Sequence, residues 1–95
     1  MIEFKKGKNY IDFKMVEEIY KEVFEYLEMI KGDQDASKSL KDHIKRVENI
    51  LNNKSEELRP QKAILELEEL NSQHISSYLK TQIWDVISRL ESLNN

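Results

Sequence analysis

Apolar residues recur at helical spacing along almost the whole chain, and residues that break helices are nearly absent. The 95 residues include only two glycines and one proline. Neighbours on one face of a helix lie three or four positions apart, and the apolar residues follow this spacing rather than the alternation of a strand. The pattern predicts helix nearly throughout, and therefore an all-α fold.

Polar stretches divide the chain into four expected helices, of which the first two occupy its N-terminal half. The first should follow Asp12 as its N-cap and end at Gly32, with Gly32 in the left-handed conformation. The second should begin near Ser37 or Ser39, the latter as part of an approximate capping box. Asparagines at positions 52–53 tolerate the left-handed conformation and should end it.

The start of the third helix is ambiguous, whereas the fourth is the clearest of all. Pro60 suits the first helical position, but Ser55 also reads as a cap, and we expect regular helix from about Pro60 after a loose turn. This helix should close at Asn71. The fourth should begin near Ser76 or Ser77.

Each helix carries one apolar stripe, and the stripes together predict the core. The chain is too short for two independent cores, so we expect one domain over residues 1–95, with residues 1–11 as a flexible N-terminal segment. The predicted core residues are Phe13, Val16, Ile19, Tyr20, Val23, Phe24, Leu27, Ile30, Leu40, Ile44, Val47, Ile50, Leu51, Ala63, Ile64, Leu67, Leu70, Leu79, Ile83, Val86, Ile87, Leu90 and Leu93.

The first two helices resemble the last two when the sequence is shifted by about forty residues. Such a shift places Leu27 on Leu67, and a shift one residue shorter places Ile44 on Ile83. Helical repeats have periods of about 34 to 47 residues, and two units are fewer than an open solenoid needs. We therefore expect two HEAT-like helical hairpins that close into one four-helix bundle, or a chain that dimerises.

Composition excludes several classes of protein. No cysteine is present, so disulfides, thiolate catalysis and cysteine zinc sites are excluded. Residues 1–8 lack the apolar run of a signal peptide, and no stretch is as long and apolar as a membrane span. We therefore predict a cytoplasmic protein with no membrane partner. The net charge of −3 argues against a general nucleic-acid binder.

Two blocks in the second half carry a family resemblance. Residues 58–70 read Leu-Arg-Pro-Gln-Lys-Ala-Ile-Leu-Glu-Leu-Glu-Glu-Leu, and residues 80–91 read Lys-Thr-Gln-Ile-Trp-Asp-Val-Ile-Ser-Arg-Leu-Glu. They resemble a small archaeal family known as uncharacterised protein family number 0147, whose pattern in the second block is Arg-Thr-x-Ile-Trp-Asn-Val-x-Ser-x-Leu-Glu. The chain matches that pattern at Thr81, Ile83, Trp84, Val86, Ser88, Leu90 and Glu91.

The likeness covers about three quarters of the chain and departs from the family mainly in the loops. The family has Asp and Pro in each hairpin turn and Arg after it, whereas residues 32–38 and 71–77 lack that pattern and Lys80 replaces the Arg. The chain is therefore similar to a divergent member. The resemblance implies a small helical bundle and an archaeal source, and it implies no activity.

The candidate chemical sites have simpler structural interpretations. Neither histidine belongs to a metal-binding motif, so we expect His43 beside the stripe of the second helix and His74 in a polar loop. Residues 33–35 begin like a calcium loop, but the glycine and glutamate required later are absent. No catalytic motif organises the Ser, His and Asp residues, and we expect no enzyme, metal or cofactor.

Lysines and aromatic residues suggest two surfaces. Lys38, Lys41 and Lys45 follow one side of the second helix, and with a basic segment at residues 5–8 they form a candidate basic face, although a solvated surface is the simpler interpretation. We expect Trp84 to pack on the core, with an anchor for a partner or second subunit as the alternative. The candidate interaction surface consists of Trp84, Tyr78, Tyr20 and Phe24.

The leading functional hypothesis is a non-enzymatic helical module that binds another protein or a second copy of itself. It follows from the repeat and from the scarcity of chemical motifs. The alternative is a nucleic-acid or ribosome-associated accessory factor that uses the basic face. A third alternative is an enzyme or ligand carrier with a pocket between the hairpins.

Overall fold

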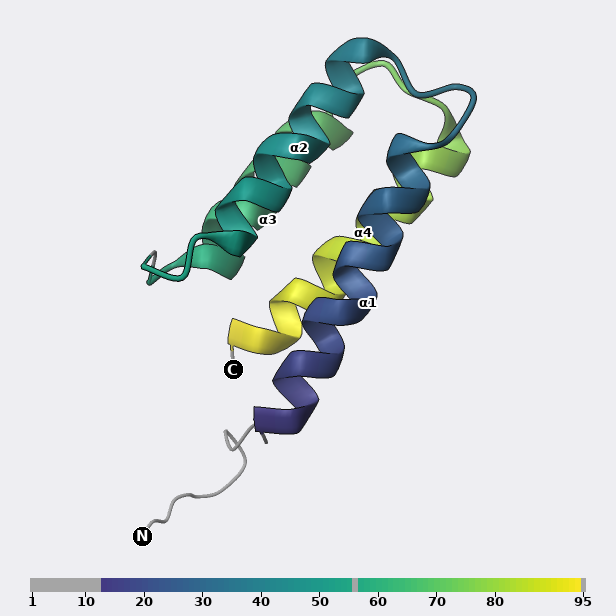
Figure 1. Ribbon diagram of the computed structural model, residues 1–95. Helices are drawn as coiled ribbons and strands as arrows, with labels where there is room; N and C mark the ends of the chain where they lie inside the picture. The colour runs from purple at the N-terminus through teal and green to yellow at the C-terminus, as the bar shows by residue number, and fades with distance from the viewer. Residues whose placement is uncertain (1–12, 56, 95) are drawn as a thin grey trace, which may run out of the picture.

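All four expected helices are present in the computed structural model of the chain, which describes residues 13–55 and 57–94 (Figure 1). The helices are α1 Phe13–Lys31, α2 Lys38–Asn52, α3 Arg59–Asn71 and α4 Ser77–Glu91, followed by the short 3-10 helix η2 Ser92–Asn94. The expectations of a flexible segment over residues 1–11 and of Asp12 as an N-cap lie outside the described residues.

Successive helices run antiparallel and close into one bundle. α1 packs against α2 and α4, and α3 packs against the same two helices on the other side. The α1–α2 contact is the least extensive of the four, and Figure 1 shows these helices diverging toward the end where α1 begins. The prediction of an all-α four-helix bundle built from two hairpins is confirmed. Among residues 13–55 and 57–94, no helix combines the length and apolar character needed to span a membrane.

A serine caps the N-terminus of the second helix in each hairpin, and the two caps have the same geometry. The Ser37 and Ser76 side-chain oxygens accept hydrogen bonds from the backbone N–H groups of Leu40 and Leu79, both at 3.1 Å. Such N-caps satisfy backbone donors that have no partner within the helix. The capping box predicted at Ser39 does not form, because Ser39 already lies within α2. The equivalence of the two caps supports the internal repeat.

The ends of the first two helices differ from the expectation of left-handed residues. The φ angle of Gly32 lies outside the left-handed region, and its N–H donates to the Glu28 carbonyl at 3.1 Å. Asn53 has a φ of −85°, and its N–H donates to the Ile50 carbonyl. Each helix therefore satisfies a terminal carbonyl by a further bond of its own, without a left-handed cap.

Proline marks the start of the third helix, as predicted. α3 begins at Arg59 with Pro60 in its first turn, and Leu58 occupies the N-cap position without a side-chain hydrogen bond. The alternative start at Ser55 is wrong, since Ser55 lies in a turn and donates to the Asn53 side chain. Pro60 fits here because a first-turn residue needs no intrahelical N–H bond.

The core is made by the stripes of all four helices. The predicted core residues that are buried are Val23, Leu27, Ile30, Leu40, Ile44, Val47, Leu51, Ala63, Ile64, Leu67, Leu70, Leu79, Ile83, Val86, Ile87 and Leu90. Partly buried residues that pack against them are Ile19, Tyr20, Phe24, Ile50 and Leu93. The stripes of α2, α3 and α4 are therefore confirmed almost residue by residue.

The N-terminal half of α1 is the exception. Phe13, predicted in the core, is 74% exposed, and Val16 is only partly buried. α1 has 19 residues against 15 in α2, which corresponds to lengths of roughly 28 and 22 Å. Because α1 is longer and diverges from α2, its stripe continues past the apolar residues that could cover it.

Lys31 connects the end of α1 to α2. Its amino group lies 2.7 Å from a Glu28 oxygen and 2.8 Å from a Glu48 oxygen. The hydrogen bond from Lys31 lowers the pKa of Glu28, while burial raises the pKa of Glu48 and the bond from Lys31 opposes that rise. Lys31 therefore offsets the cost of holding the part-buried Glu48 carboxylate in its charged form.

Replacing Lys31 with methionine should destabilise the fold by about 1 kcal/mol at neutral pH, because the part-buried Glu48 then loses its cation. The loss should shrink as the pH falls to 4.5, the ordinary glutamate value, and below. Well below that value Glu48 is protonated in both the folded and unfolded states, so its raised folded-state pKa no longer costs stability. Urea denaturation at several pH values measures this dependence.

The matched control is Lys38→Met. Lys38 forms a more exposed pair with Asp42 at 3.5 Å, and its loss should cost about 0.5 kcal/mol or less at any pH. Equal effects of the two substitutions would show that Lys31 has no special role in joining α1 to α2.

Candidate interaction groove and a buried histidine cluster

A groove opens where α1 and α2 diverge. It has a volume of about 550 Å³ and lies between the N-terminal part of α1 and the end of α2 with the following turn. Its lining residues are Phe13, Val16, Glu17, Tyr20, Lys21, Phe24, Leu51, Asn52, Lys54 and Arg59. We call this surface the α1–α2 groove. Two of the four candidate interaction residues, Tyr20 and Phe24, line it.

Arg59 lines the groove and contacts both of its walls. Its guanidinium donates a hydrogen bond to the Leu51 carbonyl at 2.8 Å and lies 5.2 Å from the centre of the Tyr20 ring. The first contact satisfies a carbonyl at the end of α2, and the second is a cation–π contact with α1. Arg59 thus connects the start of α3 to both walls of the groove.

The groove is lined by apolar side chains, which we call its apolar floor, and by basic side chains, which we call its basic rim. Lys21, Lys54 and Arg59 line it together with one acidic residue, Glu17. This local excess of positive charge contrasts with the net charge of −3 of the whole chain. The sequence predicts basic character for α2 and not for this groove, since the three cations come from separate parts of the chain.

The other two candidate interaction residues lie elsewhere. Trp84 lines a shallow hollow with Glu68, Asn71, Ser72 and Lys80, at the contact between α3 and α4. Tyr78 is also exposed, but six residues separate it from Trp84, which places the two side chains about 120° apart around α4. The structure therefore divides the predicted surface among three places.

The expectation that Trp84 packs on the core is wrong, because its side chain is 53% exposed. Its neighbour Ile83 is fully buried, and one residue further along a helix turns the side chain by about 100°. That turn carries Trp84 to the edge of α4 beside polar residues at the end of α3.

The candidate basic face has the predicted exposure. Lys38, Lys41 and Lys45 all lie on the solvent side of α2. Asp42 lies within the same stretch and pairs with Lys38, so its charge reduces the positive field locally.

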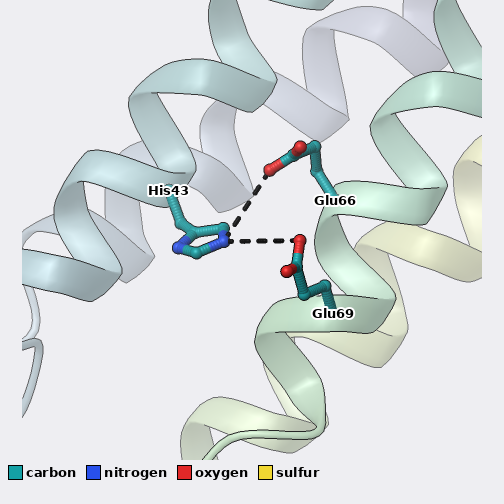
Figure 2. Close-up of side chains that lie close together, drawn as sticks. All are labelled: His43, Glu66 and Glu69. Carbon is teal, nitrogen blue, oxygen red and sulfur yellow. Dashed lines mark ion pairs between the residues drawn. The ribbon is translucent and has the colours of Figure 1, made fainter.

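A polar cluster lies between α2 and α3 (Figure 2). His43 projects from α2 toward Glu66 and Glu69 of α3, and its Nε2 atom lies 3.7 and 3.9 Å from one oxygen of each. One candidate ligand atom from each residue lies within 4.8 Å of the other two. Arg46 of α2 also lies 3.6 Å from the Glu66 oxygen.

The histidine of this cluster is buried and has no hydrogen-bond partner. His43 is 8% exposed, and both of its ring nitrogens are buried without a hydrogen bond. The Glu66 oxygen nearest to the His43 ring is likewise buried and without a hydrogen bond. Buried polar atoms normally have a partner, so three orphaned atoms in one cluster require an explanation.

The prediction that His43 lies beside the stripe of α2 is confirmed, but the sequence indicates no ligand partners for it. The missed partners lie more than twenty positions away and meet His43 only because α2 packs on α3. One signal was present in the sequence, since Glu66 and Glu69 have the spacing that puts both carboxylates on one face of a helix. His74, in contrast, is exposed in the loop before α4, as predicted.

Comparison with known proteins places the chain in a family. The model of the Uncharacterised protein family (UPF0147) matches residues 7–93. The chain belongs to this family. Searches of the curated proteins and of the solved structures each returned no match.

The match confirms the resemblance noted in the sequence. UPF0147 covers all four helices, and the matched range includes both the α1–α2 groove and the histidine cluster. Because the family description names no activity, the function of this UPF0147 member has to be argued from its own geometry.

The exposure of Trp84 can be tested against its buried neighbour. Trp84→Ser should change the free energy of unfolding by less than about 1 kcal/mol, while Ile83→Ala should lower it by about 2–4 kcal/mol, because only Ile83 is enclosed in the core. Urea denaturation followed by far-UV circular dichroism measures both. Trp84 emission in the unmodified protein should also be quenched readily by acrylamide. A shielded Trp84, or similar losses in the two variants, would contradict the described packing.

Proposed function

We propose that the protein is a non-enzymatic helical interaction module whose α1–α2 groove binds an amphipathic, acidic helical segment of a partner protein. The observation that supports this most is the coincidence of an apolar floor and a basic rim in one concave surface. Proteins commonly bind an amphipathic helix by laying its apolar face in such a groove.

The apolar floor supplies the contact area. Phe13 is largely exposed, and the partly buried Tyr20 and Phe24 present ring surface beside it. Aromatic side chains bury large areas and are enriched where binding energy is concentrated. A partner helix that places leucine or phenylalanine side chains here would cover rings that otherwise face water.

The basic rim determines the charge of the partner. Lys21 and Lys54 are exposed, Arg59 is partly exposed, and all three line the groove. A segment with carboxylates beside its apolar face would be attracted, whereas a basic segment would be repelled.

A second copy of the chain fits this surface less well. A two-fold dimer places the same patch of both subunits face to face. The groove would then bring two sets of Lys21, Lys54 and Arg59 together, and like charges across an interface oppose binding. An acidic segment of another protein therefore agrees better with the charge of the groove than a second copy of this chain.

The proposal also includes a cellular setting. We place this module in the cytoplasm, since a chain without cysteine suits a reducing compartment. The resemblance of the sequence to an archaeal family supports an archaeal source.

The second candidate is a nucleic-acid or ribosome-associated factor, favoured by the exposure of Lys38, Lys41 and Lys45 on one side of α2. It predicts binding to RNA at low salt that weakens steeply as salt is added, because phosphate contacts release counterions. Anisotropy of a labelled RNA measures it, with the triple Lys→Gln variant of these positions as the comparison. RNA binding that this variant retains, or no binding at low salt, would exclude the basic face.

The groove proposal is tested with two synthetic helical peptides. One carries leucine and phenylalanine at i, i+3, i+4 and i+7 with glutamate on both flanks, and the other has lysine in place of every glutamate. The acidic peptide should bind and the basic one should not. Phe13→Ser, and separately the double charge reversal Lys21→Glu/Lys54→Glu, should each weaken binding by at least about tenfold. Isothermal titration calorimetry gives the affinities.

Trp84→Ser is the matched control, because it removes another exposed aromatic side chain that does not line the groove. It should leave peptide binding unchanged. Equal binding of both peptides, or a loss caused by Trp84→Ser and not by Phe13→Ser, would refute the groove as the binding surface. Light scattering across concentration tests the second-copy alternative. A dimer that dissociates in the Phe13→Ser variant would show that the groove binds a second copy of this chain and not a different partner.

A further inference from the structure

We propose that His43, Glu66 and Glu69 bind one divalent transition-metal ion such as Zn²⁺, which joins α2 to α3. The site lies within the bundle wall shared by the two hairpins and is separate from the residues that line the α1–α2 groove (Figure 2). It is independent of the proposed function, so either proposal can fail without the other.

The distances fit a metal ion better than a shared proton. The Nε2 atom of His43 lies 3.7 and 3.9 Å from the two carboxylate oxygens, which is too long for a hydrogen bond. Two ligand atoms around a tetrahedral zinc ion are about 3.4 Å apart, given bonds of roughly 2.0–2.2 Å. A closure of a few tenths of an ångström would therefore bring Nε2 close enough to each oxygen to share an ion. The two carboxylate oxygens lie within 4.8 Å of each other, and a turn of the exposed Glu69 side chain would bring them closer.

The state of His43 gives independent support. The ring is nine-tenths buried, it points at both carboxylates, and neither nitrogen has a hydrogen-bond partner. A metal bound at Nε2 would satisfy that nitrogen and the orphaned Glu66 oxygen together. Glu69 remains 66% exposed, so an ion can enter from solvent without the bundle opening.

The internal repeat shows that the fold itself does not require this cluster. The contact of α2 with α3 corresponds by the repeat to the contact of α4 with α1. The shift that places Ile44 on Ile83 puts Gln82 at the position of His43. The shift that places Leu67 on Leu27 puts Tyr26 and Met29 at the positions of Glu66 and Glu69.

The corresponding place in the other half is occupied without any metal-ligating set. There the Tyr26 ring packs against the Arg89 guanidinium at 4.6 Å, and Met29 is exposed. The α1–α4 contact therefore forms without a histidine and two carboxylates at these positions. His43, Glu66 and Glu69 are a specific addition to one of two similar interfaces, which points to a role beyond packing.

Arg46 is the group that competes with the ion. Its Nε atom lies 3.6 Å from the Glu66 oxygen that would bind the metal, and its charge opposes a second cation there. The Arg46 side chain is more than half exposed, so it can turn toward solvent when an ion arrives. Removing this charge should tighten metal binding.

The donor set also selects the kind of ion. Imidazole with carboxylates suits Zn²⁺ and Co²⁺, whereas Mg²⁺ and Ca²⁺ prefer an all-oxygen set. Three protein ligands leave a further coordination position for water.

The test uses the full chain, freed of any affinity tag, and titrates it with Zn²⁺ against a chromophoric chelator and with Co²⁺ followed by visible absorption. One equivalent should bind, the Co²⁺ spectrum should show tetrahedral coordination, and Zn²⁺ should raise the melting temperature. His43→Leu and Glu66→Gln should each weaken binding by at least about tenfold. Arg46→Gln should tighten it.

Two matched controls separate this site from adventitious binding. Glu68→Gln changes an exposed carboxylate on the same helix between the two proposed ligands, and His74→Asn removes the exposed loop histidine. Both should bind the metal within about twofold of the unmodified protein, since neither side chain belongs to the proposed ligand set.

Several outcomes would overturn the proposal. The first is that the unmodified protein binds neither Zn²⁺ nor Co²⁺. The second is that His43→Leu still binds the ion as tightly as the unmodified protein. The third is that His74→Asn loses as much affinity for the ion as His43→Leu does. Because His43→Leu replaces a buried polar ring with an apolar side chain, circular dichroism of this variant confirms that any loss of binding is not a loss of fold.

Discussion

Every helix in this bundle has a single apolar stripe that only the other helices can cover, and the rest of the structure depends on that constraint. A hairpin of two such helices still leaves an apolar face in water, so the two similar hairpins must close on each other. α4 contributes the largest set of buried apolar residues and α1 the smallest, limited to Val23, Leu27 and Ile30. The bundle is therefore well closed around α3 and α4 and weakest between α1 and α2, where the groove opens.

The same constraint explains which parts of the core could be predicted from the sequence. The stripes of α2, α3 and α4 could be predicted because the spacing that makes an amphipathic helix is local. Phe13 could not, since its exposure depends on the length and direction of a neighbouring helix and not on its own position in the stripe. The prediction that Trp84 packs on the core was wrong for a related reason. It is adjacent to a core residue in sequence, but only the packing of α3 on α4 decides whether the edge of the stripe is covered.

The candidate sites were harder to predict than the fold, because their members meet only through tertiary packing. The groove rim takes Lys21 from α1, Lys54 from a turn and Arg59 from α3, and a scan for local runs of charge does not join them. The histidine cluster likewise spans two helices. Metal motifs are recognised in sequences by short spacings, and here only the pair of glutamates has one. The repeat could have helped, since His43 replaces a glutamine in an otherwise similar pattern.

The two proposed sites have no residue in common, but both involve the α2–α3 pair. One wall of the α1–α2 groove, with Leu51 and Arg59, belongs to the α2–α3 pair, and the other wall belongs to α1. An ion held by His43, Glu66 and Glu69 would add a bond between α2 and α3 and stabilise the first wall alone. The second wall would still rely on the weaker α1–α2 contact, on Lys31 and on the Arg59–Tyr20 contact. Metal binding should therefore stabilise the bundle without closing the groove, because no ligand of the ion comes from α1.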